Sequence, residues 1–272
     1  MASSGSMLVG NELSEEEQVW MAQLAEAAKA EGLTIDSRFM LASFAIVGKG
    51  DIKKSLKRVR NWNKVNELYK LKETTEAEAT KWMVDTMSQF MICVGTDKEG
   101  LGGYGVHLGS FTPSVVKTEY DERCIIRAMA DNMRSNTPTI AEVRKGAFTF
   151  TNMEGIGWGN ISMSLEKKIS SVYQDAYPFK MKKTYLVNPP SFLFVLLHAA
   201  RLFIKKKLID RIQTCKPEDL PKYFDQSQIP ESLGGGMKQS YWDRRAENLK
   251  VHRASVAEME SGHGPMASTV SM

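Results

Sequence analysis

The stretch MKKTYLVNPPSFLFVLLHAARLFIKKK, residues 181–207, is the part of the sequence on which the fold prediction depends. Its first eight residues have the pattern of a β-strand. The segment from Phe192 to Ile204 is almost entirely apolar and is interrupted only at His198 and Arg201. A membrane span needs about 20 predominantly apolar residues, so this run is too short to be one. Its length is more typical of a buried core helix or of a segment at a membrane interface.

The bulk composition predicts a soluble globular chain. Its 272 residues, 42% of them hydrophobic and 25% charged, suffice for one sizeable core, or for a core with a small helical domain beside it. The net charge of +4 is mild, so any anionic partner would have to be recognised by local clusters of Lys and Arg. Cys93, Cys124 and Cys215 have no metal-ligand spacing and are expected to be reduced thiols of a cytoplasmic protein.

Helices are predicted throughout the N-terminal third. Ser14 and Glu17 have the spacing of a capping box, which predicts a helix over residues 14–31. Asp36 is expected to cap a second helix, and Asp51 is expected to cap a third that contains the basic sequence KKSLKRVRNWNK.

From Phe90 onward, strand patterns alternate with helical ones. The predicted strands are FMICVGTD, YGVHLGS, GAFTFTNMEG and MKKTYLVN, and helical spacing covers residues 114–135 and 160–175. This alternation predicts an α/β domain with a mixed, largely parallel sheet flanked by helices, preceded by a small all-helical domain. We divide the chain into a disordered or cloning-derived start (1–13), an N-terminal helical domain (14–89), the α/β domain (90–236), and a C-terminal helix with a mobile tail (237–272).

Enzymatic and nucleotide-binding interpretations have little support in the sequence. GLGGYG, residues 100–105, has the letters of the dinucleotide fingerprint, but a strand pattern follows it where that fingerprint needs a helix. It is better interpreted as a hairpin turn. His107 and His198 have no neighbour at ligand spacing, and no nucleophile elbow is present, so neither a metal site nor a hydrolase is indicated.

The basic stretch places four cations on one side of the third helix, namely Lys53, Lys57, Arg60 and Lys64. A solvated helix face is the favoured interpretation, because charge on an exposed helix is ordinary. An anionic membrane surface is the next alternative. Nucleic acid comes last, since no aromatic stacking platform accompanies the cations.

The apolar segment after the last predicted strand has a narrow polar stripe. Phe194, His198, Arg201 and Lys205 follow helical spacing, and the rest of the circumference is apolar. Composition alone favours a buried core helix over an element that moves or touches a membrane.

Four motifs occur in a fixed order between Phe90 and Gly235. They are the GTDKEG turn, the strand GAFTFTNMEG, the Tyr-Pro strand that ends in Asn188-Pro-Pro, and the closing IPESLGG. In this order they resemble the CRAL-TRIO domain, the family of α-tocopherol transfer protein and cellular retinaldehyde-binding protein. The resemblance implies a hydrophobic pocket floored by the sheet and closed by a mobile helical gate, SFLFVLLHAARLFIKKK.

The resemblance also implies a non-enzymatic carrier that binds one hydrophobic molecule and transfers it at membranes. The cargo would be a retinoid, carotenoid, tocopherol or other lipid, with no cofactor besides it and no nucleic-acid partner. The expected ligand-binding residues lie on the strands and the gate: Phe148, Phe150, Tyr185, Val187, Phe192, Leu196 and Phe203.

Family members also use basic residues beside the gate to hold a phosphoinositide headgroup. Position by position, that role falls on Lys180, Lys182, Lys207 and Arg211, which implies transient contact with an anionic membrane surface. The alternative function is a phosphoinositide-reading membrane adaptor that transports no cargo.

The sequence departs from the family pattern in three places. The arginine-bearing N-terminal helix of the family is replaced by FMLASFAIVG, with one basic position kept as Lys57. NMEG replaces the common Asp-bearing end of the central strand. Leu202 stands where the family has a proline in the gate, which predicts a longer and less broken helix.

Overall fold

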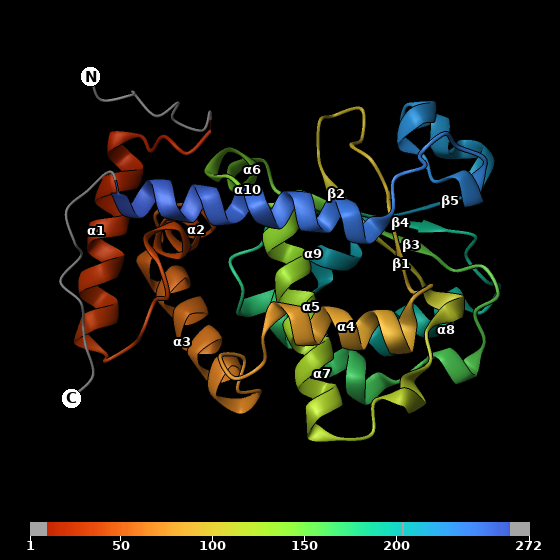
Figure 1. Cartoon of the computed structure of the whole chain (residues 1–272), viewed down its shortest axis with the longest axis horizontal. Coiled ribbons are helices and arrows are strands. Elements are labelled where there is room, and N and C mark those ends of the chain that lie inside the picture. The colour runs from red at the N-terminus through yellow and green to blue at the C-terminus, as the bar shows by residue number, and fades with distance from the viewer. Residues whose placement is uncertain (1–9, 203, 262–272) are drawn as a thin grey trace.

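The computed structural model describes residues 10–202 and 204–261, in which a group of N-terminal helices is followed by a sheet with helices around it (Figure 1). The N-terminal helices are α1 (Glu15–Ala30), α2 (Arg38–Gly48), α3 (Ile52–Leu68) and α4 (Glu76–Met87). The later helices are α5 (Glu119–Asn136), α6 (Ile140–Lys145), α7 (Met163–Asp175), α8 (Leu193–Ala200), α9 (Lys206–Ile209) and α10 (Tyr241–Ser261). Short 3-10 turns are η1 (Leu108–Ser110), η2 (Pro113–Val115), η3 (Trp158–Asn160), η4 (Pro217–Lys222), η5 (Gln226–Gln228) and η6 (Glu231–Leu233).

Local capping determines where the first helices begin. Ser14 and Glu17 form the predicted capping box at the start of α1, and Asp51 accepts a hydrogen bond from the backbone N–H of Lys54 at 3.0 Å at the start of α3. The predicted cap of α2 was wrong by one residue, because Ser37 and not Asp36 accepts the backbone N–H of Met40.

The sheet has five strands in the order β1 (Met91–Ile92), β2 (Gly103–His107), β3 (Ala147–Asn152), β4 (Met181–Val187) and β5 (Ile212–Cys215). β1 pairs with β2 antiparallel, and all the other neighbours are parallel, which confirms the predicted mixed, largely parallel sheet. GLGGYG runs from the β1–β2 connection into β2, so the hairpin interpretation is confirmed.

The GTDKEG turn is held by one buried carboxylate. Asp97 is 4% exposed and accepts the backbone N–H groups of Glu99 and Leu101, both at 2.9 Å. The Tyr185 hydroxyl donates to Asp97 Oδ2 at 3.2 Å from β4, which ties the turn to the middle of the sheet. The aspartate therefore has a structural role in this motif.

The two faces of the sheet differ in how closely they are covered. Phe148, Phe150, Tyr185 and Val187 alternate onto one face, where each is at most 1% exposed. They pack against side chains of the segment that contains η4 to η6, including Phe224, whose ring centroid lies 5.4 Å from that of Phe148. We call this the closed face.

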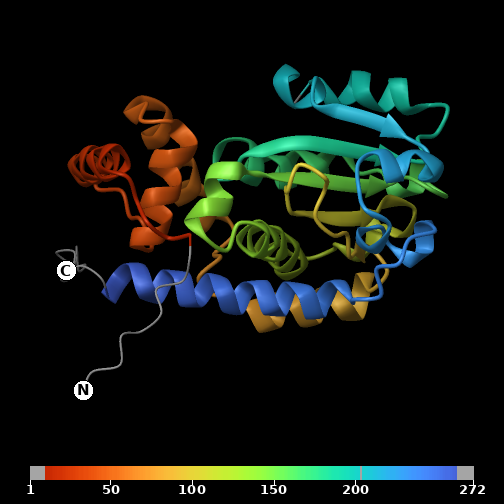
Figure 2. The same ribbon diagram turned by 90° about the horizontal axis from the view of Figure 1, so that it is seen from above.

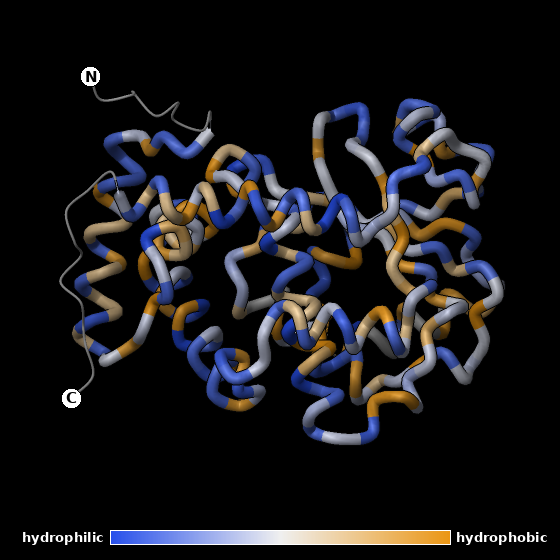
Figure 3. The backbone as a smooth tube through the Cα atoms, in the orientation of Figure 1, coloured by the Kyte–Doolittle hydropathy of each residue, from blue (hydrophilic) through white to orange (hydrophobic). Residues whose placement is uncertain are grey.

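The last helix, α10, joins the N-terminal helices to the sheet domain. It extends past both along the length of the molecule (Figure 2), and its residues are hydrophilic along most of that length (Figure 3). It packs on α2 and α5.

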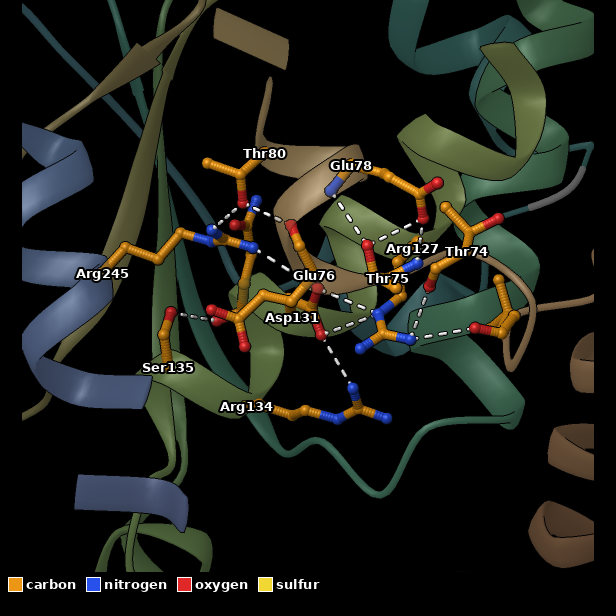
Figure 4. Close-up of polar contacts among 12 residues, drawn as sticks. Thr74, Thr75, Glu76, Glu78, Thr80, Arg127, Asp131, Arg134, Ser135 and Arg245 are labelled. Atoms are coloured by element: carbon orange, nitrogen blue, oxygen red, sulfur yellow. Dashed lines mark hydrogen bonds and ion pairs between the residues drawn. The ribbon is translucent and has the colours of Figure 1, made fainter. Parts of the chain in front are cut away.

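A buried ionic network fixes α10 in this position (Figure 4). Asp131 of α5, 1% exposed, pairs with Arg127 at 3.0 Å, Arg134 at 2.7 Å and Arg245 of α10 at 3.5 Å. Arg245 also donates to the Thr80 hydroxyl of α4 at 2.7 Å. One carboxylate therefore connects three helices through charge-assisted hydrogen bonds.

Candidate functional site

The gate region begins at a strained turn after β4. Asn188 has a positive φ of 53°, which only Gly, Asn and Asp adopt readily. Its side-chain amide donates to Asn152 Oδ1 at 3.1 Å, and its backbone N–H donates to the carbonyl of Cys215 at 3.2 Å. The turn thus directs the chain away from the carboxyl ends of three neighbouring strands and into α8.

Helix α8 lies against the face of the sheet opposite the closed face. Leu193, 6% exposed, packs with Leu186 of β4 and Met153, and Leu197 and Ile212 pack at the edge of the same group. We call the sheet surface beneath this helix the α8 face.

The outward side of the gate region exposes large apolar side chains. Val195 is 58% exposed and Leu202 is 87% exposed. Trp158, 63% exposed, stacks on Phe192 with ring centroids 5.0 Å apart. Exposed apolar side chains that gather on one part of a surface are typical of sites that bind another protein, a ligand or a membrane.

The expected longer gate helix was wrong. α8 ends at Ala200, Lys205 has an extended backbone with ψ of 137°, and a separate helix, α9, begins at Lys206. The helix therefore stops without the family proline, and nothing buries Leu202 at the position where it would have to continue.

The α8 face is less completely covered than the closed face. Thr149 and Leu186 are each 8% exposed, and Thr151, Thr184 and Ile212 are half-buried. The Thr149 hydroxyl donates to the Thr184 hydroxyl at 3.0 Å, so these two polar groups satisfy each other on an otherwise apolar surface.

Two side chains of β2, the strand next to β3, lie on the same face of the sheet as Thr149 and Thr151. Tyr104 and Val106 are half-buried and pack against the main core. Burial raises the pKa of Tyr104, with a smaller contribution from the negative charge of Glu166 on α7, so its hydroxyl remains protonated.

The structure divides the expected ligand-binding residues between two places. Phe148, Phe150, Tyr185 and Val187 lie on the closed face, away from α8, whereas Phe192 lies beside α8 with Trp158. The alternation FTFT puts aromatic side chains on one face of the strand and threonines on the other. The residues expected from the sequence were the aromatic ones, and these lie on the closed face. The side chain of Leu196, and the whole of Phe203, lie outside the described residues.

Three of the four expected headgroup residues lie together at the amino ends of the strands, opposite the end at which the gate begins. Lys180 and Lys182 lie at the start of β4, and Arg211 donates to the carbonyl of Met181 from the turn before β5. Burial lowers the pKa of Lys180, and the positive charges of Lys182, Lys49 and Arg211 lower it further.

We call Lys49, Lys180, Lys182 and Arg211 the basic cluster. Lys49 was missed from sequence because it comes from the end of α2, about 130 positions before Lys180, where its positive φ of 57° follows the helix. Lys207 is exposed on α9, four positions before Arg211.

The basic side of α3 is partly neutralised. Arg60 pairs with Glu31 at 2.5 Å and Lys54 pairs with Asp51 at 2.6 Å, while Lys53 and Lys57 are exposed near the start of the helix, which follows Lys49 in the chain. Within the described part of the chain, no group of three or more potential metal ligands is present.

The CRAL/TRIO domain model matches residues 86–235, which include the whole sheet, α8 and the closing motif. The chain belongs to the CRAL/TRIO domain family. This confirms the resemblance found in the ordered motifs, and the family is of the lipid-binding and lipid-transfer type.

Two curated proteins share parts of this CRAL/TRIO chain. A CRAL-TRIO domain-containing protein of Dictyostelium discoideum is 37% identical over 79 residues, which cover 29% of this chain and 31% of that protein. The human tyrosine-protein phosphatase non-receptor type 9 is 30% identical over 95 residues, 35% of this chain and 16% of the phosphatase. The chain thus spans less than a third of the length of either relative.

The fold of this CRAL/TRIO chain is also that of a solved structure. The crystal structure of Sfh5 superposes with a TM-score of 0.56 over 91% of this chain and 99% of that one, at 11% sequence identity. Among the residues described for this chain, none of the helices is both long and apolar enough to cross a bilayer.

Proposed function

We propose that the chain is a carrier that binds one hydrophobic small molecule between the α8 face of the sheet and α8, and transfers it at membranes. The observation that supports this most directly is the difference between the two faces of the sheet. The closed face is sealed by aromatic packing, whereas the α8 face keeps half-buried side chains under a short helix.

The gate has apolar surface on both sides, which suits it to opening at a bilayer. Leu193 covers the sheet from α8, while Val195 on the same helix and Leu202 just after it point outward. Moving such a helix into water would expose its inner side at about 25 cal/mol per Å² of apolar area. A membrane surface removes most of that cost, so opening is coupled to membrane contact.

The α8 face favours a cargo that is mostly apolar but carries one hydrogen-bonding group, to which the Tyr104 hydroxyl can bond while Thr149 and Thr184 bond to each other. The Thr149 and Thr184 hydroxyls and the protonated Tyr104 hydroxyl come from three adjacent strands. A retinoid, carotenoid, tocopherol or phospholipid satisfies this description.

Native mass spectrometry of the purified chain, with organic extraction of what it retains, tests cargo binding. We expect a single lipophile that exchanges with added lipid. A chain that neither retains nor takes up a lipophile contradicts the proposal.

The variant Val195→Asp tests whether the outward side of the gate contacts the membrane. We expect this variant to lose most vesicle binding and transfer while still retaining cargo, because the charge faces the membrane and not the sheet. Val19→Asp is a matched control, since Val19 is a valine 53% exposed on helix α1. Equal transfer by the two variants argues against membrane contact through the gate.

We further propose that the basic cluster recognises a phosphoinositide headgroup. Four cations converge there, and clustered Lys and Arg form charge-assisted bonds to phosphate. The variant Lys180→Glu/Lys182→Glu should lose its preference for phosphatidylcholine vesicles that contain a phosphoinositide. Lys29→Glu/Lys250→Glu changes the same charge at exposed positions elsewhere and should keep that preference.

This experiment also separates the carrier from the membrane adaptor. A carrier with the altered cluster retains cargo in solution but delivers it more slowly to phosphoinositide vesicles. An adaptor contains no cargo in either form.

A further inference from the structure

A hollow lies between α10, the end of α5, α6 and the β1–β2 connection. Its larger part has a volume of about 130 Å³, and its polar lining includes Thr96, Asn136, Lys145, Arg244 and Asn248. A smaller part of about 10 Å³ adjoins it and is lined by Arg244, Asn248 and also Arg245. None of the described residues that line the hollow belongs to the basic cluster or to α8.

The smaller part of the hollow borders the buried ionic network of Asp131 through Arg245. Arg127, Arg134 and Arg245 share the carboxylate of Asp131, so two of these three guanidinium charges exceed it. Arg245 is 5% exposed, and its Nε–H group has no hydrogen-bond partner. A buried cation with an unsatisfied donor is unfavourable unless an anion or acceptor is supplied.

The larger part adds two more cations. Arg244 uses one N–H group of its guanidinium to donate to the carbonyl of Val94 at 2.7 Å, which fixes the group at the wall of the hollow. Lys145 ends α6 on the other side. Glu142 is the acidic residue among the described lining residues, and its carboxylate already accepts from the backbone N–H and hydroxyl of Thr139 at 3.0 and 2.8 Å.

We propose that this hollow binds a phosphoryl group, with Lys145 and Arg244 holding its oxygens and the guanidinium of Arg245 adding positive charge beside it. Guanidinium groups present several N–H donors in a geometry that matches phosphate, and a doubly charged oxyanion would offset the excess of positive charge. The amide of Asn248 and the hydroxyl of Thr96 supply neutral hydrogen bonds. The volume suits inorganic phosphate or a small phosphomonoester.

Such a ligand would connect α10 to α6 and to the β1–β2 connection. Because it would bind only the folded chain, it should raise the unfolding temperature in a saturable way. The described lining of the hollow shares no residue with the basic cluster or with α8, so phosphate binding there is measured with its own variants.

The test is thermal unfolding of the full chain in increasing inorganic phosphate, compared with chloride at equal ionic strength, together with ³¹P NMR of the added phosphate. We expect saturable stabilisation of the wild type. Arg244→Gln and Lys145→Gln should each weaken phosphate binding about tenfold or more, because each removes a charged donor. Lys250→Gln, an exposed cation on α10, is the matched control and should bind as the wild type does.

A second arm distinguishes a soluble ligand from a lipid headgroup. Phosphatidylcholine vesicles with and without phosphatidylinositol 4-phosphate are compared for the wild type and Lys145→Gln. Binding of inorganic phosphate identifies a soluble ligand, and an effect of Lys145→Gln on phosphoinositide vesicles alone identifies a headgroup; both support a phosphoryl site.

The proposal is overturned if neither probe responds, or if Lys145→Gln and Arg244→Gln bind both probes as the wild type does. Lys145→Gln keeps the test decisive even where Arg244→Gln lowers stability through its lost bond to Val94, because the Lys145 side chain is exposed.

Discussion

Single residues control how the chain leaves the sheet for the gate. Asn188 combines a left-handed backbone with side-chain and backbone bonds to the ends of β3 and β5. The left-handed conformation costs most non-Gly residues about 1–2 kcal/mol, and asparagine tolerates it because its short side chain bonds locally.

We therefore expect Asn188→Ala to lower the free energy of unfolding by about 2 kcal/mol, since it combines backbone strain with a lost hydrogen bond. Asn188→Gly, which relieves the strain but loses the same bond, should lose about half as much. Urea denaturation measures both. Equal losses would mean that strain plays no part at this turn.

His252 is a second residue with a consequence that can be measured. It is 8% exposed, stacks edge-on against Phe39 at 4.7 Å, and its Nδ1 has no hydrogen-bond partner. Burial, followed by the positive charge of Arg134, lowers the pKa of His252 from 6.5 to about 4.

Because the unfolded chain binds this proton more readily than the folded one, stability is complete above pH 6.5 and falls as the pH drops toward 4. The contribution across this window is on the order of 3 kcal/mol. His252→Phe should flatten the pH dependence of unfolding between pH 4 and 6.5. A slope unchanged from the wild type would show that the pKa of His252 is the same in the folded and the unfolded chain.

At the scale of elements, α10 is held by charge as well as by apolar packing, which buries Leu249 and Met259. Asp131 is the carboxylate that binds α10 to α4 and α5 through Arg245. Removing one partner from a buried ionic group typically costs about 3–5 kcal/mol, because the remaining charges are left uncompensated.

Asp131→Asn should therefore lose about 3–5 kcal/mol of stability and speed hydrogen exchange in α10 before the sheet. Asp243→Asn, at an exposed position in the first turn of α10, provides the comparison and should change little. Exchange that accelerates equally in the sheet and in α10 would show that the helix does not detach first.

The elements were predicted from sequence wherever local chemistry determines them. Capping residues located α1 and α3, and alternating strands located β2 to β4. The sequence did not indicate β5, whose four residues IQTC have no distinctive pattern. It also did not indicate which face of GAFTFTNMEG meets α8, because both faces are buried and only the packing partners distinguish them.

For the whole molecule, the basic cluster and the start of the gate lie at opposite ends of β4. The basic cluster gathers at the amino ends of the parallel strands, whereas Asn188 begins the gate at their carboxyl ends. Its first member, Lys49, comes from a different part of the chain, which is why spacing alone could not reveal it.

Vesicle binding should therefore depend on salt while cargo retention should not. The Debye length falls from about 10 Å at 0.1 M salt to about 3 Å at 1 M, which screens exposed cations but leaves apolar contacts intact. Sedimentation with phosphoinositide vesicles measures vesicle binding across this range of salt, and organic extraction measures the retained cargo. Cargo that is lost in parallel with vesicle release would contradict separate sites for the cargo and the membrane.

The stacked rings of Trp158 and Phe192 give the gate an optical signature. Phe192 immediately precedes α8, and the indole that covers it is 63% exposed. Any displacement of the gate separates the two rings and changes the polarity around the indole. A chain in which the other four tryptophans are replaced by phenylalanine would report gate movement through the emission wavelength of Trp158 alone, without an attached dye.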